Sequence, residues 1–300
     1  MKTVIAIVGP TAAGKTALSI ALAKALKTEI ISADSRQFYK EMSIGTAVPD
    51  KYELAAAPHH FIQHKSIFDD YNVGNFEQEF LALSGQLFQK HNTLILVGGS
   101  GLYIDAACKG LDNLPGRNAQ IRTTLEAGWQ QEGIGFLQQK LLKLDPEYYA
   151  QVDLLNPHRL IRAIEILEQS GGKKMADLQG NRPQRDFKTL YIGLNSSRPH
   201  LYDRINKRVD LMMANGLLEE VKKLYPHKNL NALKTVGYRE LFHYLDGDYS
   251  LDFAVSEIKK NTRRFAKRQL TWFRKNQAIH WFDINDSFDK IITFASEQIR

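Results

Sequence analysis

A phosphate-binding loop is the clearest chemical signal in this 300-residue sequence. Residues 9–16 match the pattern G-x-x-x-x-G-K-[ST] and lie between an apolar run and a helical pattern, where that motif must lie. The glycines let backbone N–H groups turn towards phosphate oxygens, and the start of the following helix adds partial positive charge. We therefore expect a diphosphate or triphosphate to be held by Gly9, Pro10, Thr11, Ala12, Ala13, Gly14, Lys15 and Thr16.

Two side chains of this loop have expected roles of their own. Lys15 would place a point charge on the terminal phosphate, and the Thr16 hydroxyl would bind Mg²⁺. The motif indicates a phosphorylated ligand, but it does not indicate that the ligand is ATP.

A second polar group follows the next predicted strand, residues 29–32. Asp34 stands at the carboxyl end of that strand, and ligands of open α/β sheets bind at this edge. We therefore expect Asp34 to serve chemistry, with an aspartate that caps a helix as the alternative. Ser35, Arg36 and Gln37 follow directly, and such a mixture of polar groups is expected where the edge of a nucleobase is read.

Short β-branched runs alternate with longer helical patterns, which predicts a parallel sheet flanked by helices. The predicted strands are residues 3–8, 29–32, 93–97, 189–194 and 278–282. The predicted core helices are residues 15–26, 76–90, 102–109, 201–224, 251–275 and 289–300. With the phosphate loop after the first strand, the expected fold is α/β with a P-loop NTPase-like sheet.

The alternation stops between residues 114 and 187, where the sequence contains no convincing strand. Helical patterns cover residues 118–132, 135–142 and 157–169, and a segment rich in Gly, Lys, Asn and Pro follows at 171–183. We therefore expect a catalytic core of residues 1–113 and 188–300, interrupted by an all-helical insertion domain of residues 114–187.

The composition is that of a folded chain with a polyanionic partner. Hydrophobic residues make up 43% of the sequence, and the formal net charge of +7 favours polyanions. The single cysteine, Cys108, excludes an internal disulfide and is consistent with a reducing cytoplasm. Residues 3–8 are too short for a signal peptide or a membrane span, so we expect a cytoplasmic chain without membrane contact.

The helical pattern at residues 251–275 separates charged from apolar side chains. On a helical wheel one side carries Lys260, Arg263, Arg264, Lys267, Arg268, Arg274 and Lys275. The opposite side carries Ile258, Phe265, Trp272 and Phe273. Since Glu257 is the only acid between Val255 and Lys275, we expect the apolar side to dock on the core and the basic side to bind RNA phosphates. A merely solvated charged face is the alternative.

A series of ordered blocks makes this sequence resemble the tRNA dimethylallyltransferase (isopentenyltransferase) family. The blocks are residues 34–39, 42–47, 58–62, 71–76, 98–103, 156–163, 234–240 and 262–274, so the likeness spans nearly the whole chain. The sequence departs from the family pattern in having Ser100 for a usual Thr, Val48 for a common Lys and Gln63 for a common Asp. No role is assigned to Val48 or Gln63.

The resemblance implies transfer of a dimethylallyl group from dimethylallyl diphosphate to the exocyclic amine of the adenosine on the 3′ side of the anticodon, with release of diphosphate. The phosphate loop and Mg²⁺ would stabilise the departing diphosphate, and Arg208 would clamp it unless Arg208 is a solvated surface residue. Asp34 would accept the amine proton, and Ser100 would contact the tRNA or the leaving group. The predicted catalytic residues are Lys15, Thr16, Asp34, Ser100 and Arg208.

The same resemblance implies binding of the anticodon stem-loop of tRNA. The adenine of a closed loop must leave its stack to reach Asp34, so we expect it to be drawn out. We also expect the chain to be a monomer. The expected tRNA contacts are Asp34, Ser35, Arg36, Gln37, Ser100, Arg122, His158, Arg159, Leu160, Ile161, Arg162, Lys234, Thr235, Val236, Gly237, Tyr238 and Arg239. Ordinary ion pairing is the alternative for Arg159 and Arg162, and a simple turn is the alternative for Gly237 and Tyr238. His59 and His60 are adjacent in a loop and are expected to be structural rather than metal ligands.

Two other functions share some of these features. A small-molecule kinase that uses ATP would have the same loop and sheet, but it would leave the basic helix unexplained. A non-catalytic RNA-binding NTPase module would leave residues 34–37 without a role. A prenyltransferase that acts on free adenylate needs neither the insertion nor an RNA-facing helix.

Overall fold

The computed structural model describes residues 1–299. Arg300, the last residue of the helix expected at 289–300, lies outside the described residues. The chain forms two compact units. Unit 1 contains Met1–Cys108 and the chain from Arg185 onward, and unit 2 is Lys109–Gln184.

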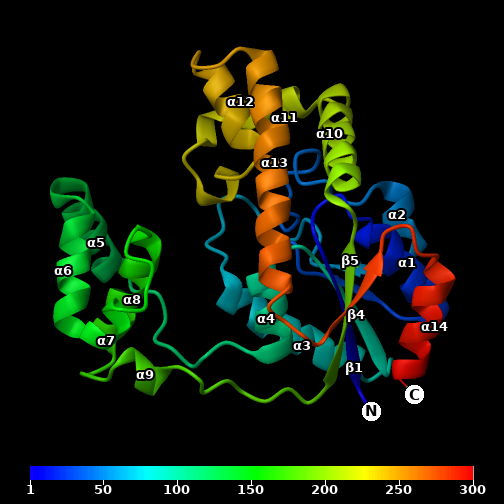
Figure 1. Ribbon diagram of the computed structural model, residues 1–300, viewed down its shortest axis with the longest axis horizontal. Coiled ribbons are helices and arrows are strands. Elements are labelled where there is room, and N and C mark those ends of the chain that lie inside the picture. The colour runs from blue at the N-terminus through cyan, green and yellow to red at the C-terminus, as the bar shows by residue number, and fades with distance from the viewer. Residues whose placement is uncertain (300) are drawn as a thin grey trace. The chain divides into compact units, whose positions relative to one another are not determined.

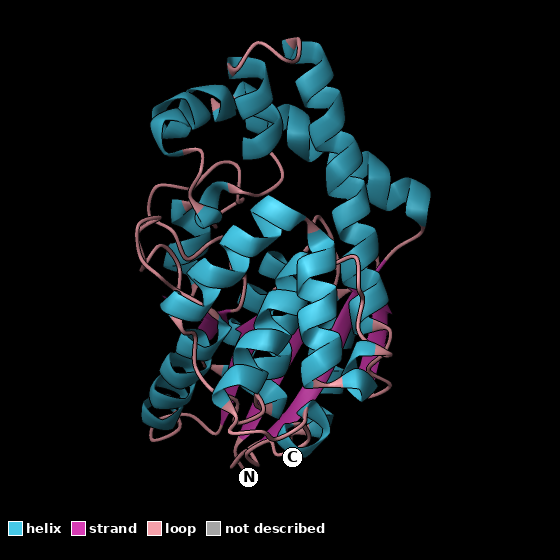
Figure 2. Ribbon diagram, turned by 90° about the vertical axis from the view of Figure 1, so that its left-hand side faces the viewer, coloured by secondary structure: helices cyan, strands magenta, loops and turns pink. Residues whose placement is uncertain are grey.

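Unit 1 is built on six parallel strands (Figures 1 and 2). They are β1 (Thr3–Val8), β2 (Ile30–Ser32), β3 (His59–His60), β4 (Thr93–Val97), β5 (Lys188–Asn195) and β6 (Ile279–Asp283). Their order in the sheet is β3-β2-β4-β1-β5-β6. Because β1 lies between β4 and β5, the loop that follows it opens at the carboxyl edge of the sheet beside the ends of its neighbours. The P-loop NTPase-like sheet predicted from the sequence is confirmed.

Helices cover both faces of this sheet because side chains of β1 alternate between two cores. Ile5 and Ile7 pack in a core with helices α1 (Lys15–Leu26) and α14 (Phe288–Gln298). Val4 and Ala6 pack in a core with α3 (Val73–Leu87) and α4 (Gly101–Lys109). These four residues of β1 are completely buried, so the strand that leads into the phosphate loop is fixed from both sides.

A further group of helices stands beyond the carboxyl ends of the strands (Figure 1). It consists of α10 (Arg198–Ala214), α11 (Leu217–Leu224), α12 (Tyr238–Leu245) and α13 (Leu251–Phe273), with the single turns η1 (Tyr225–His227) and η2 (Asn231–Leu233). One hydrophobic core joins all four helices to residues that follow β2, including Tyr39 and Met42. Among residues 1–299, no helix combines the length and the hydropathy needed to cross a membrane.

The single helix predicted at residues 201–224 is wrong, because the structure has two helices there. Gly216, at the start of α11, has φ +95°, a left-handed conformation that ends α10 and favours glycine. The sequence analysis also missed strand β3 and the short helices α2 (Lys51–Ala56) and α12. These elements contain only two to eight residues, too few for a clear periodic pattern.

All regular secondary structure in unit 2 is helical. Its helices are α5 (Ala119–Glu132), α6 (Ile134–Leu144), α7 (Pro146–Tyr149), α8 (Pro157–Gln169) and α9 (Met175–Leu178). They share a core in which Leu125, Leu137 and Ile164 are completely buried. The buried Asp145 joins two of the helix starts, because its carboxylate accepts from the backbone N–H groups of Tyr148 and Met175.

Candidate active site

The phosphate loop turns sharply between β1 and α1. Gly9 has φ +142°, and a Cβ there would lie 2.5 Å from the carbonyl oxygen of Leu194 on β5, so only glycine fits. Gly14 has φ +89° and is the N-cap of α1, whose first N–H groups therefore border the loop. The sequence motif thus has the backbone conformation that an anion site at a helix start requires.

Three basic side chains surround this loop. Lys15 Nζ donates to a carbonyl oxygen of the loop itself at 2.8 Å. Arg204 Nε donates to the Ala12 carbonyl at 2.7 Å, and Arg208 Nη1 donates to the Thr11 hydroxyl at 3.4 Å. The structure therefore brings the predicted Arg208 to the phosphate loop. It also brings Arg204 to this loop.

The positive charges at the loop are in part desolvated. Burial is the main cause that lowers the pKa of Lys15 to about 8, and the charge of Arg208 lowers it further, whereas Asp34 acts in the opposite direction. Burial, followed by the charge of Arg204, also lowers the pKa of Arg208, again against Asp34. The charge of Glu53 acts on Arg208 in the same direction as that of Asp34. Three cations thus lie close together at the loop, and such a cluster favours binding of a polyanion.

Asp34 lies just beyond the end of β2, as predicted. One of its carboxylate oxygens accepts from the backbone N–H two residues further on, at 3.1 Å. The backbone N–H of Ser35 donates to the Ser100 hydroxyl at 3.1 Å, and the two hydroxyl oxygens lie 3.0 Å apart. The ends of β2 and β4 are therefore tied together beside Asp34.

The other two side chains of this segment hold neighbouring loops. Arg36 donates to the carbonyl oxygens of Asn231 and Ala232 at 3.3 and 2.9 Å. Gln37 donates to the Ala47 carbonyl at 2.8 Å. The Arg36 and Gln37 side chains are thus occupied in holding other loops. Within residues 34–37, the Asp34 carboxylate is the group best placed for chemistry.

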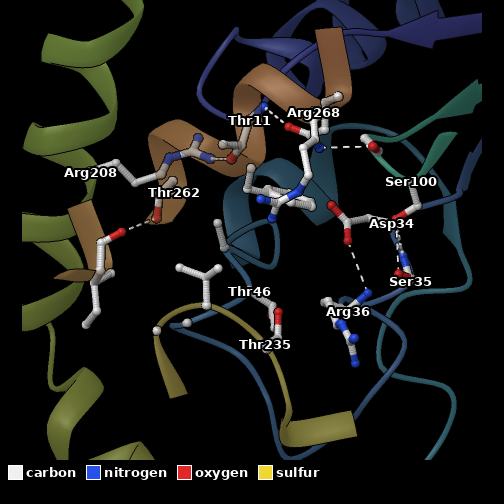
Figure 3. A pocket seen from close by; sticks show the side chains of 18 of the residues that line it. Thr11, Asp34, Ser35, Arg36, Thr46, Ser100, Arg208, Thr235, Thr262 and Arg268 are labelled. Atoms are coloured by element: carbon white, nitrogen blue, oxygen red, sulfur yellow. Dashed lines mark hydrogen bonds between the residues drawn. The ribbon is translucent and has the colours of Figure 1, made fainter. Parts of the chain in front are cut away.

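Two adjoining cavities meet at Asp34, and Figure 3 shows the first of them. The first, about 460 Å³, reaches Ser100 and the segment around Lys234. The second, about 450 Å³, is lined by the phosphate loop, including Lys15 and Thr16. Both are lined by Thr11, Asp34, Thr46, Ala47, Arg208, Phe265 and Gln269. Figure 3 shows Asp34, Ser35 and Ser100 grouped together, with Thr11 and Arg208 across the cavity. We name the first the acceptor cavity and the second, which the phosphate loop lines, the phosphate cavity.

Helix α13 forms a wall of the acceptor cavity, and this corrects the helical-wheel prediction. Ile258 and Phe273 are buried, as predicted for the apolar side. Phe265 and Trp272, however, are 37% and 40% exposed, because they line the cavity together with Arg268. Arg268 is exposed, and its guanidinium lies over the Phe265 ring, 5.7 Å from the ring centroid, so a basic side chain also borders this cavity.

The remaining basic residues of α13 divide into two groups. Arg263 donates to Asn206 on α10 at 2.8 Å, and Lys260 pairs with Glu257 at 2.7 Å, so neither simply faces outward. Besides Arg268, the exposed basic residues are Arg264 and Lys267 on α13 and Arg274 and Lys275 directly after its end. The surface predicted to meet RNA is therefore smaller than the sequence suggested.

Sequence reasoning missed Glu220 on α11. Its carboxylate accepts from the backbone N–H groups of Ser43, Ile44 and Gly45 at 2.8–3.1 Å and from the Tyr238 hydroxyl at 2.6 Å. The loop of residues 43–47, which borders both cavities, is thus clamped by one side chain. No sequence signal indicated this, because Glu220 resembles any acid in the first turn of a helix.

Two of the three departures from the family pattern, Val48 and Gln63, lie near the same loop. Gln63 Nε2 donates to the Ser43 hydroxyl at 2.7 Å. Val48 lines the phosphate cavity. Gln63 thus supports the loop, and Val48 adds an apolar surface at the place where the family commonly has a lysine.

The segment predicted to contact tRNA at residues 234–239 borders the acceptor cavity. The residues that line it are Lys234, Thr235, Val236, Gly237 and Arg239. Tyr238 is completely buried and packs against Gly45, so its side chain is not available to an outside partner. Glu240 closes the turn by accepting from the backbone N–H of Gly237 at 2.8 Å.

In unit 2 the predicted contact residues differ in their surroundings. His158 and Arg159 are exposed at the start of α8, whereas the side chains of Leu160 and Ile161 are buried in the unit's core. Those two side chains therefore cannot reach a partner in this conformation.

Arg122 and Arg162 in unit 2 take the ion-pairing role. Arg122 donates to the completely buried Glu165 from Nε at 2.8 Å and from Nη2 at 3.0 Å, and Arg162 donates from Nη1 at 2.6 Å. Burial raises the pKa of Glu165, but hydrogen bonds from Arg122, Arg162 and the Asn118 N–H outweigh this and hold it below its usual value.

The adjacent histidines have structural partners. His60 Nε2 lies 2.6 Å from Glu29, and His59 Nδ1 lies 2.7 Å from the Ala57 carbonyl. Within residues 1–299, no group of three His, Cys, Asp or Glu side chains is arranged to hold a metal ion. A Mg²⁺ ion that is bound chiefly by phosphate oxygens does not need such a group.

Fold and site together define a P-loop α/β protein with a phosphate-loop cavity on one side of a carboxylate and a second cavity on the other. The sequence profile of the family described as IPP transferase matches residues 37–276. The chain belongs to this family.

Known relatives resemble the whole chain. A tRNA dimethylallyltransferase from Christiangramia forsetii is 57% identical over 295 residues, which cover 98% of each chain. The solved tRNA isopentenylpyrophosphate transferase of Bacillus halodurans has a TM-score of 0.75 at 38% identity and covers 100% of this chain and 97% of that one. A eukaryotic dimethylallyltransferase, described as acting on tRNA, has a TM-score of 0.79 at 26% identity, with coverage of 99% and 77%.

Proposed function

We propose that this enzyme transfers a dimethylallyl group from dimethylallyl diphosphate to the exocyclic amine of the adenosine on the 3′ side of the tRNA anticodon. One observation carries the proposal: two cavities meet at Asp34, and the residues of the phosphate loop from Ala12 to Thr16 line only one of them. A donor with its diphosphate in the phosphate cavity would present its allylic carbon near Asp34. The adenine would enter through the acceptor cavity.

The phosphate cavity supplies stabilisation of the leaving group. Loop N–H groups, Lys15 and Arg208 would bind the diphosphate and would bind it more strongly as it departs with full charge. Thr16 lines the same cavity as Asp34, so a hydroxyl and a carboxylate are available to Mg²⁺, an ion that prefers oxygen ligands. When bound, the ion would neutralise charge on the diphosphate.

Asp34 is the proposed general base. The adenine nitrogen forms a bond to the allylic carbon, the bond from that carbon to the diphosphate oxygen breaks, and Asp34 takes the amine proton. Apolar side chains of the acceptor cavity, including Val209, Met212 and Phe265, would keep water away from the electron-poor carbon. Hydrogen bonds to Ser35 would hold Ser100 beside the reacting groups, where the sequence predicted it.

Three surfaces are proposed to hold the tRNA. They are the exposed basic residues of α13, the rim at residues 234–239, and the start of α8 in unit 2 with His158 and Arg159. The anticodon stem-loop offers phosphates to the first and splayed bases to the others. Unit 2 is thus proposed as the insertion domain that contacts tRNA. We also propose that the chain works as a monomer and that it lies in the cytoplasm. The single cysteine, Cys108, is consistent with that reducing compartment.

The test is a prenyl-transfer assay with Mg²⁺, dimethylallyl diphosphate and an unmodified anticodon stem-loop that carries the acceptor adenosine. Mass spectrometry of the RNA should show the dimethylallyl group. Asp34→Asn should lower kcat by about 10²- to 10⁴-fold and leave diphosphate binding intact. Asp69→Asn is the matched control, because Asp69 also accepts from a backbone N–H, that of Ser66, but lies at the surface.

A kinase remains the alternative that shares the phosphate loop. Incubation with ATP and candidate hydroxyl acceptors would then yield ADP and a phosphorylated product, while the RNA would stay unmodified. That result would refute the prenyl-transfer assignment.

A further inference from the structure

Gln269 is a buried amide that the proposed chemistry does not use. It lies on α13 and is only 6% exposed. Its Oε1 accepts from the backbone N–H of Thr11 at 2.8 Å, and its Nε2 donates to the carbonyl oxygen of Gly99 at 2.9 Å. Each end of the amide therefore has one partner, and the two partners belong to different loops.

The two loops that Gln269 joins line different cavities: the phosphate loop lines the phosphate cavity, and the turn at Gly99 lines the acceptor cavity. Thr11 belongs to the phosphate loop, which would hold the donor. Gly99 precedes Ser100, whose hydroxyl accepts from the backbone N–H of Ser35, the residue after Asp34. One side chain thus connects the donor loop, through a turn after β4, to the segment that carries the proposed base.

The turn that contains Gly99 packs closely against the Gln269 amide. A Cβ at Gly99 would lie 2.2 Å from Gln269 Nε2 and 3.7 Å from Lys15 Nζ, so the turn approaches the helix as closely as glycine allows. The Thr11 N–H is directed at Gln269, which leaves the later N–H groups of the loop for the phosphate. Loss of the amide would leave the Thr11 N–H and the Gly99 carbonyl without the side chain that joins them.

We infer that Gln269 is a positioning residue that sets the distance between the phosphate loop and the Ser100 turn, so that the allylic carbon and the adenine amine meet beside Asp34. The inference rests on the proposed prenyl transfer. Diphosphate binding itself does not depend on this bridge, because Lys15, Arg204 and Arg208 hold the loop independently. Misplacement of reacting groups by about 1 Å can cost on the order of 10²-fold in rate, so kcat is the quantity that should respond.

The experiment compares Gln269→Ala, Gln269→Glu and a control, Ser256→Ala. Ser256 is exposed on the same helix, and its hydroxyl donates only within that helix, to the Phe253 carbonyl. Gln269→Ala should lower kcat by on the order of 10²-fold, with KM for donor and RNA within about threefold of the wild type. Gln269→Glu, when ionised, keeps the acceptor for Thr11 but has no donor for Gly99, so it should also lower kcat. The control should match the wild type.

Amide hydrogen exchange provides a readout that does not depend on the reaction. In Gln269→Ala, peptides that contain Thr11 and peptides that contain Ser35 should both exchange about tenfold faster or more. The Thr11 N–H loses its acceptor, and the turn that carries Ser100, the acceptor of the Ser35 N–H, loses its link to α13 through Gly99. Peptides from unit 2 should not change.

The possible failures can be told apart. A wild-type protein that transfers no prenyl group refutes the proposed function, while the exchange experiment still tests the bridge. Faster exchange at Thr11 without any change at Ser35 would overturn the inference. So would a folded Gln269→Ala enzyme with wild-type kcat, or one whose whole defect lies in KM for the donor.

Discussion

Replacing Lys15 by methionine should stabilise the folded protein while removing its affinity for diphosphate. Lys15 carries its charge in a site where burial lowers its pKa from 10.5 to about 8. At about 1.4 kcal/mol for each unit of pKa, charged Lys15 at pH 7 costs the folded protein up to about 3.5 kcal/mol. Partial contact with water and loss of the 2.8 Å bond to the Pro10 carbonyl reduce the gain, so we expect about 1–2 kcal/mol. For a protein of this size, the corresponding rise in Tm is about 2–6 °C.

The difference in stability between the wild type and Lys15→Met should depend on pH in a defined direction. Because the pKa of Lys15 is lower in the folded than in the unfolded protein, the unfolded state binds more protons between pH 8 and 10.5. Stability of the wild type should therefore rise through this window relative to the variant. The advantage of Lys15→Met should be largest below pH 8 and should fade as the pH approaches 10.5.

Thermal unfolding with and without inorganic diphosphate measures both effects. Diphosphate at 100 times its Kd should stabilise the wild type by about 2.7 kcal/mol and should leave Lys15→Met unchanged. Lys24→Met is the matched control, because Lys24 lies exposed in the last turn of the same helix, and its effect should stay within about 0.5 kcal/mol. A Lys15→Met protein that melts below the wild type at pH 7, or that keeps its full advantage at pH 10, would refute the reasoning.

Two further predictions concern unit 2 and the RNA surface. Glu165→Gln should destabilise unit 2 by about 3 kcal/mol, because two arginines lose their buried charged partner. The pKa of Glu165 is lowered by folding, so the deficit of the variant should be full above the unfolded carboxyl's pKa and should shrink on acidification; a deficit independent of pH would contradict the assignment. Lys267→Ala should remove about one phosphate contact with tRNA. The slope of log Kd against log salt concentration should therefore decrease by about 1. An unchanged slope would remove Lys267 from the RNA surface.

The sequence by itself determined the parts of the site whose causes are local. The phosphate loop needs a strand, glycines at particular positions and a helix start, and all of these lie within a few neighbouring residues. The position of Asp34 followed in the same way, since the carboxyl end of a strand can be read from the chain. The alternation of strands and helices was enough to predict the parallel sheet.

The tertiary structure decided which distant side chains complete the site. Gln269 reaches Thr11 and Gly99 across separations of 258 and 170 residues, and Glu220 clamps a loop about 175 residues away. No local pattern encodes such pairs, because a glutamine or a glutamate on a helix looks the same whether it faces solvent or a loop.

The helical wheel of α13 shows the same division. The sequence identified a helix with a basic and an apolar side, and both sides exist. The alternation of side chains cannot reveal whether an apolar side meets a packed core or an open cavity. Packing of the neighbouring helices left a cavity beside Phe265 and Trp272, and the space around a helix face is set by the rest of the chain rather than by the helix itself.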